Sequence, residues 1–270
     1  MTRVEEFGDA KLILGDCREM LEIKPYSVDF IFVDPTYGHN NNDDDLISVR
    51  ELALGQAKEG EIYASRPISN DDPERAKALI KWLFDEATKS LVKGGCICCC
   101  CSGGGGKDVA LAEWTLMMVA VPRLEFKQII PWDKGPMGMG WHFRRSYEVI
   151  LDAKRKGAPC KWYDKTRKVE NIIRPGQYSI YKIIPGADQH PTEKPPELAA
   201  HFIGLHTQPG ELVLDPFMGA GSTGLAAIRL GRKFLGIEID QHWFDVACRK
   251  IEAEVQAKES GEDLMEALFG

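Results

Sequence analysis

A glycine loop near the end of the chain limits the possible folds most strongly. In VLDPFMGAGSTG, Gly219, Gly221 and Gly224 form a Gly-x-Gly-x-x-Gly pattern between an apolar strand and a predicted helix. Such a loop seats an adenosine-containing cofactor, because its glycines permit a tight turn and the helix N-terminus offers free N–H groups. A doubly wound sheet normally begins with this unit. Here fewer than fifty residues follow it, which means that strands from the N-terminal half must complete the sheet.

Seven apolar segments are predicted strands, and helices separate most of them. The strands are expected at 10–16, 27–34, 96–101, 124–132, 146–154, 211–216 and 233–240. Helices are expected from Asp72 to Leu91, with Gly94-Gly95 as the stop, over 107–120, after 195, from the glycine loop to Leu230, and from 241. This pattern predicts an α/β fold in a single domain over 1–270, with a doubly wound, mostly parallel sheet that is circularly permuted.

A second motif, VDPTYG at 33–38, directly follows the apolar strand SVDFIF. Ligands of an open α/β sheet bind at the carboxyl ends of its strands. In a permuted sheet this strand lies close to the strand that precedes the glycine loop. Asp34, Pro35 and Tyr37 are therefore expected beside the cofactor.

Two acids indicate which cofactor the loop holds. Glu238 ends the strand after the loop, where a carboxylate can accept both hydroxyls of a ribose. Asp215 lies just before the loop, where its charge would repel a pyrophosphate but attract an ammonium or sulfonium group. The pair favours S-adenosylmethionine over a dinucleotide, and no hydride-transfer site supports a dehydrogenase.

These motifs resemble those of the beta group of DNA amino-methyltransferases. Asp34-Pro35-Thr36-Tyr37 resembles the Asp-Pro-Pro-Tyr catalytic motif, and LDPFMGAGSTG resembles the cofactor loop. HPTEKP at 190–195 and GIEID at 236–240 match two further elements. The motif order, catalytic first and cofactor loop last, is that of this group. The resemblance spans roughly residues 10–255 and implies a Rossmann-like, S-adenosylmethionine-dependent methyltransferase fold.

The resemblance implies methylation of the exocyclic amine of a base flipped out of DNA. Hydrogen bonds to the Asp34 carboxylate and the Pro35 carbonyl would turn the amine's lone pair toward the methyl group, and Tyr37 would stack on the base. An initial aspartate is commoner in adenine-modifying members, which favours adenine N6 over cytosine N4. Thr36 replaces the second proline of the family motif, and we expect a looser loop with activity retained.

The resemblance also assigns cofactor contacts to residues from both ends of the chain. Thr192 and Lys194 would reach the cofactor carboxylate, although a helix cap and a surface lysine would explain them equally. The other expected contacts, from the cofactor's adenine through its ribose to its methionine end, are Asp16, Cys17, Glu238, Asp215, Phe217, Gly219 and Gly221.

A net charge of −7 conceals a basic segment. Residues 141–182 carry eleven Lys or Arg against four acids, a net of +7, which leaves −14 for the remainder. A local basic patch can hold phosphates, and a solvated charged surface is the alternative. We expect target recognition over 156–187, with help from a mobile insertion over 38–70. The candidate nucleic-acid contacts are Arg144, Arg145, Lys161, Lys165, Arg167 and Lys168.

Eight cysteines, five of them in CICCCC, indicate a reducing, cytoplasmic environment. Neighbouring strand residues point to opposite faces, so this run is expected to supply small buried side chains and no metal site. No apolar run approaches the length of a membrane helix, and the first ten residues are too polar for a signal peptide.

The expected partner is double-stranded DNA. The resemblance adds a homodimer and a cognate restriction endonuclease, as part of a restriction-modification pair, as candidate partners. Three other interpretations remain open from the sequence: cytosine-N4 methylation, methylation of RNA or protein amides, and an inactive homologue that binds only cofactor and DNA.

Overall fold

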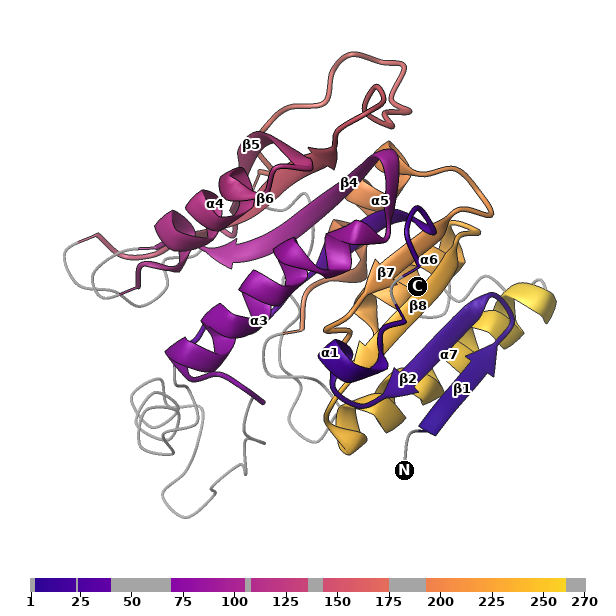
Figure 1. Cartoon of the computed structure of the whole chain (residues 1–270). Coiled ribbons are helices and arrows are strands. Elements are labelled where there is room, and N and C mark those ends of the chain that lie inside the picture. The colour runs from indigo at the N-terminus through magenta and orange to yellow at the C-terminus, as the bar shows by residue number, and fades with distance from the viewer. Residues whose placement is uncertain are drawn as a thin grey trace.

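The computed structural model describes residues 3–22, 24–39, 69–104, 108–135, 143–174 and 193–260. One eight-stranded sheet crosses it in the order β1-β2-β8-β7-β3-β4-β6-β5 (Figure 1). The strands are β1 (Arg3–Phe7), β2 (Ala10–Leu14), β3 (Val28–Val33), β4 (Leu91–Ser102), β5 (Leu124–Asp133), β6 (Tyr147–Arg155), β7 (Leu212–Asp215) and β8 (Lys233–Glu238). The helices are α1 (Cys17–Met20), α3 (Pro73–Asp85), the 3-10 turn η1 (Ala87–Lys89), α4 (Ala110–Ala120), α5 (Pro196–His206), α6 (Ser222–Arg229) and α7 (Gln241–Ser260).

The centre of the sheet is parallel and its borders are antiparallel. Strands β2, β8, β7, β3 and β4 run parallel to their neighbours, whereas β1, β6 and β5 pair antiparallel. From β3 the chain moves outward to β4, and from β7 it moves outward in the other direction to β8. The gap between β3 and β7 is therefore the topological switch point. The predicted permuted, doubly wound and mostly parallel sheet is confirmed.

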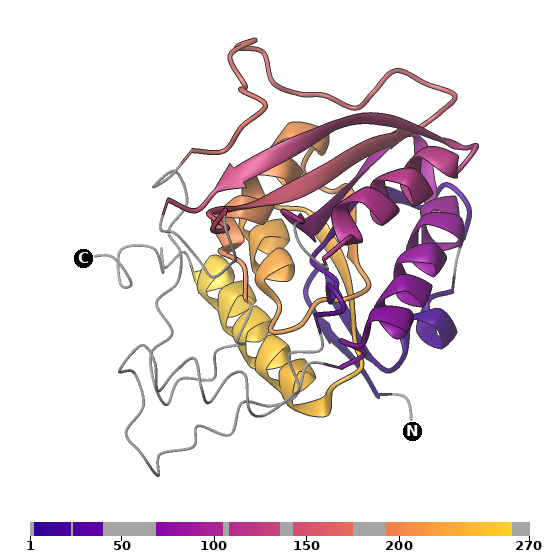
Figure 2. The same cartoon turned by 90° about the vertical axis from the view of Figure 1, so that its left-hand side faces the viewer.

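Helices cover both faces of the sheet (Figure 2). Residues of α3 and α4 pack with one set of strand side chains, and residues of α5, α6 and α7 pack with the other. The cysteine run shows this alternation directly, because Cys96, Cys98 and Cys100 join the second core while Cys99 and Cys101 join the first. All five are buried, as predicted, and fill space as small apolar groups.

The predicted helix from 72 to 91 is too long. Helix α3 ends at Asp85, and β4 already begins at Leu91, so Gly94-Gly95 lies inside the strand. Gly94 has a φ of +80°, and a Cβ there would lie 2.2 Å from the Pro159 carbonyl oxygen. The register between β3 and β4 shifts here, which marks a bulge. Gly94 therefore permits the close approach of a later segment, and Gly95 permits that of the Asp29 carbonyl oxygen, which would lie 2.7 Å from a Cβ. Neither glycine stops the helix.

That later segment, residues 156–174, crosses the molecule from one edge of the sheet to the other. At the amino-terminal edge of the parallel strands, the Lys161 N–H donates to the Gly94 carbonyl (2.9 Å). The Tyr163 N–H then donates to the Leu205 carbonyl (2.8 Å), and Ile173 pairs with Trp132 near the end of β5. Residues 175–187 of the predicted recognition segment and 40–68 of the predicted insertion lie outside the described residues. Within the described part of the chain, none of the helices combines the length and apolar character required to cross a bilayer.

Candidate active site

Asp34 and the glycine loop follow neighbouring parallel strands. Strand β3 ends at Val33 and β7 ends at Asp215, and pairing of Ile31 with Leu214 sets the two strand ends side by side. Burial raises the pKa of Asp215 to about 7, and the charge of Asp34 contributes to the increase. The two carboxylates are thus within electrostatic reach, and the two motifs share one edge of the sheet.

Asp34 belongs to a hydrogen-bonded cluster that contains a second carboxylate, Glu148, and two lysines. The Tyr37 hydroxyl donates to Asp34 Oδ1 (2.9 Å), and Lys194 Nζ lies 3.0 Å from Asp34 Oδ2. Glu148, on β6, lies opposite, with its Oε2 3.0 Å from Lys194 Nζ and 3.1 Å from the Tyr37 hydroxyl. Lys134 Nζ pairs with Glu148 Oε1 at 2.5 Å. Two carboxylates therefore share Lys194 between them.

The cluster shifts the pKa values of its two carboxylates in opposite directions. Burial raises the pKa of Asp34, and the charge of Glu148 adds to this while Lys194 opposes it. Burial also acts to raise the pKa of Glu148, but Lys194 and Lys134 outweigh it and lower the pKa to about 2. Burial raises the pKa of the Tyr37 phenol well above its usual value. The site thus holds a firmly ionised Glu148, a neutral phenol, and an Asp34 that takes up a proton more readily.

Asp71 organises the backbone after the catalytic motif. The Thr36 hydroxyl donates to Asp71 Oδ1, and the same oxygen accepts the Gly38 and His39 N–H groups (3.1 and 3.2 Å). Asp71 is 2% exposed. The hydroxyl of Thr36, which replaces the family's second proline, therefore anchors the loop to a buried carboxylate. This anchor offsets the backbone freedom gained at φ when the proline is lost. The expectation of a looser loop did not include it.

The glycine loop leaves space above the end of β7. A Cβ on Gly219 would meet nothing within 4 Å, and its φ of +51° lies in the left-handed region. The Gly219 N–H donates to Glu238 Oε2 (2.9 Å), and the Phe217 N–H donates to Asp215 Oδ1 (3.0 Å). Burial raises the pKa of Glu238 to about 7. Two buried carboxylates are thus fixed around an open loop.

Asp16 and Cys17 lie at the same edge, just after β2. The Gly15 N–H donates to the Glu238 carbonyl (2.8 Å), which joins the ends of β2 and β8. Asp16 caps α1 by accepting the Arg18 N–H (2.9 Å), and the Arg18 guanidinium lowers the pKa of its carboxyl. The Cys17 side chain is buried, and burial raises the pKa of its thiol to about 12. Cys17 is therefore a neutral packing group.

A family model described as DNA methylase matches residues 28–249. The chain belongs to this family. The predicted class of enzyme is thereby confirmed, because the match spans both the catalytic motif and the cofactor loop of the methylase.

Two curated relatives match most of the methylase. DNA adenine methyltransferase YhdJ of Escherichia coli is 29% identical over 96% of this chain and 88% of its own length. Type II methyltransferase M2.DpnII of Streptococcus pneumoniae is 27% identical over 86% of this chain and 85% of its own. Both relatives are thus similar to the methylase over nearly its whole length.

Solved structures confirm the fold. The M1.HpyAVI complex with S-adenosylmethionine is 23% identical and covers 90% of this chain and 98% of its own, with a TM-score of 0.59. The cytosine-N4-specific PvuII DNA methyltransferase is 16% identical and covers 95% and 94%, with a TM-score of 0.66. At these identities the similarity concerns architecture alone.

Lys194 belongs to the cluster around Asp34. Its ammonium lies between Asp34 and Glu148 and 5.3 Å from the centre of the Tyr37 ring. Lys194 is 8% exposed, so the alternative of a surface lysine is also excluded. Its predicted partner Thr192 lies outside the described residues. A contact of Lys194 with the carboxylate of the cofactor stays a prediction.

The predicted nucleic-acid contacts fall into three groups. Arg144 and Arg145 precede β6 at the active-site edge, where Arg145 lies 3.5 Å from Asp108. Lys161 lies at the opposite edge, where its ammonium pairs with Asp29 (2.6 Å) and Glu211 (2.5 Å). Such a doubly paired lysine is a structural link and is poorly placed for phosphate.

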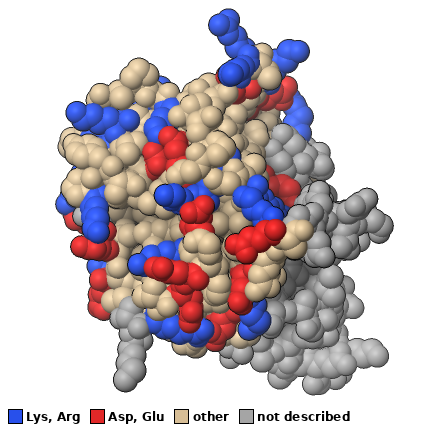
Figure 3. All heavy atoms as spheres, turned by 90° about the vertical axis from the view of Figure 1, so that its right-hand side faces the viewer, with Lys and Arg blue, Asp and Glu red and all other residues tan. Residues whose placement is uncertain are grey.

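The third group lies on the crossing segment 156–174. Its basic side chains project at the top of the molecule in Figure 3, whereas the rest of that face mixes both signs of charge. The members of this group are exposed and stand apart from the catalytic cluster; they are Lys165, Arg167 and Lys168. A DNA contact by them stays a prediction.

Sequence reasoning missed Glu148 and its partner Lys134. Glu148 directly precedes the apolar run 149–151 of β6 and comes near Asp34 only because β6 pairs with β4, next to β3. The one local signal is an acid near the start of an apolar run. Asp108 was also missed: it lies 3.0 Å from His39 Nε2 and ties the loop after the catalytic motif to α4.

Proposed function

We propose that the methylase transfers a methyl group from S-adenosylmethionine to the exocyclic amine of a base flipped out of double-stranded DNA, with adenine N6 as the acceptor. The observation that carries this proposal is the position of Asp34 beside the glycine loop at the switch point of the sheet. A methyl acceptor bound by Asp34 and a methyl donor bound by the loop would lie next to each other at this edge of the sheet.

The residues of the loop suit S-adenosylmethionine. The open space over Gly219 admits a ligand close to the backbone, and Glu238 is oriented by the N–H groups of Gly219 and Asp240. In this proposal Glu238 accepts the ribose hydroxyls, and Asp215 faces the cationic methionine end. When bound, S-adenosylmethionine supplies an electrophilic methyl group on a positively charged sulfur.

Asp34 is equipped to orient a weakly nucleophilic amine. Each of its oxygens already accepts one hydrogen bond, from Tyr37 or from Lys194, and each keeps a further lone pair for a substrate N–H. Lys194 favours the ionised carboxylate that accepts this bond. Burial raises the pKa of Asp34. The carboxylate oxygen that accepts the substrate N–H can therefore also take the proton that the amine releases after methylation.

Adenine is favoured over cytosine by two observations. The motif begins with an aspartate, Asp34, and the relative YhdJ is named an adenine methyltransferase. Cytosine N4 is the second candidate, because the PvuII enzyme has the same architecture and is cytosine-N4-specific. The cluster around Asp34 serves either amine, since both are exocyclic nitrogens on an aromatic ring.

The test is expression of the methylase in a host free of DNA methylation, followed by single-molecule sequencing of the host DNA. We expect N6-methyladenine in one sequence context. Asp34→Ala is expected to abolish the mark while S-adenosylmethionine binding is retained, measured by calorimetry. A cytosine-N4 mark would replace the first candidate by the second. A mark that survives in Asp34→Ala would refute the assigned catalytic motif, and methylation of RNA alone would refute DNA as the substrate.

The finer expectations belong to the same proposal. We expect 156–187 and 38–70 to read the target sequence, and we expect the methylase to work in the cytoplasm. A homodimer is tested by light scattering. The type II relative M2.DpnII supports a restriction-modification role, which protection of the modified DNA from a cognate endonuclease would test.

A further inference from the structure

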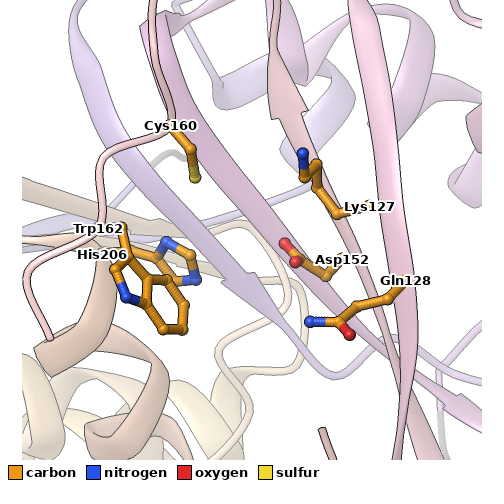
Figure 4. Close-up of a pocket in the computed structure, with 6 residues that line it drawn as sticks. All are labelled: Lys127, Gln128, Asp152, Cys160, Trp162 and His206. Atoms are coloured by element: carbon orange, nitrogen blue, oxygen red, sulfur yellow. The ribbon is translucent and has the colours of Figure 1, made fainter. Parts of the chain in front are cut away.

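A second cluster of reactive side chains lies at the amino-terminal edge of the sheet, away from Asp34. It surrounds a hollow of about 440 Å³ (Figure 4). Cys160 points into it from the crossing segment, Asp152 from β6 and His206 from the end of α5. Cys96, at the start of the cysteine run in β4, lies with its Sγ 3.2 Å from that of Cys160.

The ligand atoms converge from four separate elements. The sulfurs of Cys96 and Cys160 and a ring nitrogen of His206 all lie within 4.8 Å of one another. The same limit holds for the ligand atoms of Cys98, Asp152 and His206. Cys96, Asp152 and His206 are buried, which distinguishes this set from a solvated group of polar residues.

His206 is held in the orientation that a metal ligand requires. Its Nδ1 lies 2.9 Å from the Lys161 carbonyl and so carries the proton that it donates there, and a further side-chain hydrogen bond joins the ring to Cys160. Its ring stacks on Phe30 and meets the Trp162 ring edge-on. A backbone carbonyl behind a fixed imidazole is the usual support of a histidine ligand.

We infer that Cys96, Cys160 and His206 bind a structural zinc ion, and that Asp152, which has His206 as a common neighbour, moves toward the two sulfurs as the fourth ligand. Two thiolates, one imidazole and one carboxylate are ligands that Zn²⁺ accepts in tetrahedral geometry. With both thiols deprotonated the bound site has a net charge of −1, and the ammonium of Lys127, which lines the same hollow and also pairs with Glu125, offsets it. Two sulfurs on tetrahedral zinc stand about 3.8 Å apart, so binding requires a small widening of the sulfur contact in addition to the approach of Asp152.

Metal binding at Cys96 and Cys160 requires both thiols to release their protons, because the thiolate is the form that binds metal. The expectation of no metal site considered the cysteine run by itself, whereas the ligands combine that run with β6, α5 and the crossing segment.

A zinc ion here would fasten the crossing segment to the sheet and to α5. Cys160 lies between Pro159, which touches the bulge in β4, and Lys161, which pairs with Asp29 and Glu211. The ion would therefore add a third link at the start of the segment that carries Lys165, Arg167 and Lys168.

The experiment is metal analysis of the full chain, purified under reducing conditions, loaded with zinc and freed of excess ion. We expect stoichiometric zinc by mass spectrometry of the metal, and thiolate-to-metal charge-transfer bands when cobalt(II) replaces it. Cys160→Ser, at a half-buried position, is expected to bind zinc at least roughly 100-fold more weakly. Cys248→Ser, on the distant helix α7, is the matched control and should keep full zinc content.

Three results would overturn the inference. The first is wild-type protein that stays free of zinc after loading. The second is a Cys160→Ser variant that binds zinc as tightly as the wild type. The third is oxidation of Cys96 and Cys160 to a disulfide, seen as loss of two hydrogens in the intact mass, in protein that binds no metal when reduced.

Discussion

Lys194 controls the charge state of Asp34. It is the cation closest to that carboxylate, at 3.0 Å, and it opposes the effect of burial on the Asp34 pKa. In Lys194→Met the pKa of Asp34 should rise further, because the ion pair is removed and Glu148 still repels. The acid limb of the pH profile of kcat/KM should then move to higher pH by about one unit or more. Lys77→Met, which breaks a surface pair with Glu113, is the control and should leave the limb in place.

Asp215 makes the ligand-free fold less stable as pH rises toward neutrality. Its pKa is about 7 in the folded chain and roughly 4 in an unfolded one. Between these values the folded state binds more protons, so the free energy of unfolding falls by about 1.4 kcal/mol per pH unit for this group. Asp215→Asn should flatten the decline in urea stability between roughly pH 5 and pH 7. Asp245→Asn, at a half-buried residue that pairs with Arg3 and whose pKa is lowered, should not change that slope. An equal slope in both variants would contradict the prediction.

At the residue scale, sequence predicted the groups that motifs carry and missed those that packing recruits. Asp34, Asp215 and Glu238 follow strand ends, where position along the chain fixes position at the edge. Glu148 and Lys194 reach Asp34 only through the order of the strands and the entry to α5. No local pattern encodes that order.

At the element scale, a comparison of two glycines distinguishes the cost of backbone strain from the loss of a ligand contact. Gly219 lies in the loop between β7 and α6, and Gly210 lies just before β7. Gly219 and Gly210 both have positive φ, +51° and +83°, and a Cβ on either would meet nothing within 4 Å. Alanine at each position should cost about 1–2 kcal/mol of stability through the left-handed backbone alone. Only Gly219→Ala should also weaken S-adenosylmethionine binding, by roughly 10-fold or more. Calorimetric titration of both variants checks this, and equal affinities would contradict the assigned cofactor loop.

Element types were more predictable than element ends. The seven predicted strands all form, because each is a short apolar run that the sheet buries. Strand β1 was not predicted, since its burial pattern is mostly exposed and it pairs on one side only. The stop assigned to Gly94-Gly95 was wrong because the residues that approach these glycines closely, Pro159 at Gly94 and Asp29 at Gly95, are distant in sequence.

At the scale of the whole molecule, an acidic body carries a basic projection. If Lys165, Arg167 and Lys168 bind phosphates, their replacement by alanine should lower the slope of log K against log salt by about 0.9 for each phosphate that is no longer neutralised. Alanine at Lys24, Lys81 and Lys233, which are also exposed, changes the net charge equally and should leave the slope unchanged. DNA-binding titrations over a range of salt concentrations measure both. Equal slopes in the two triple variants would place the DNA elsewhere.

The adjacency of β3 and β7 has a consequence for biosynthesis. During translation β3 and β4 emerge early, but β7, which pairs with the other edge of β3, emerges late. Until then the nascent polypeptide exposes an unpaired row of N–H and C=O groups and has no seat for a methyl donor. A translation product that ends before β7 would therefore lack the strand and the glycine loop that flank Asp34.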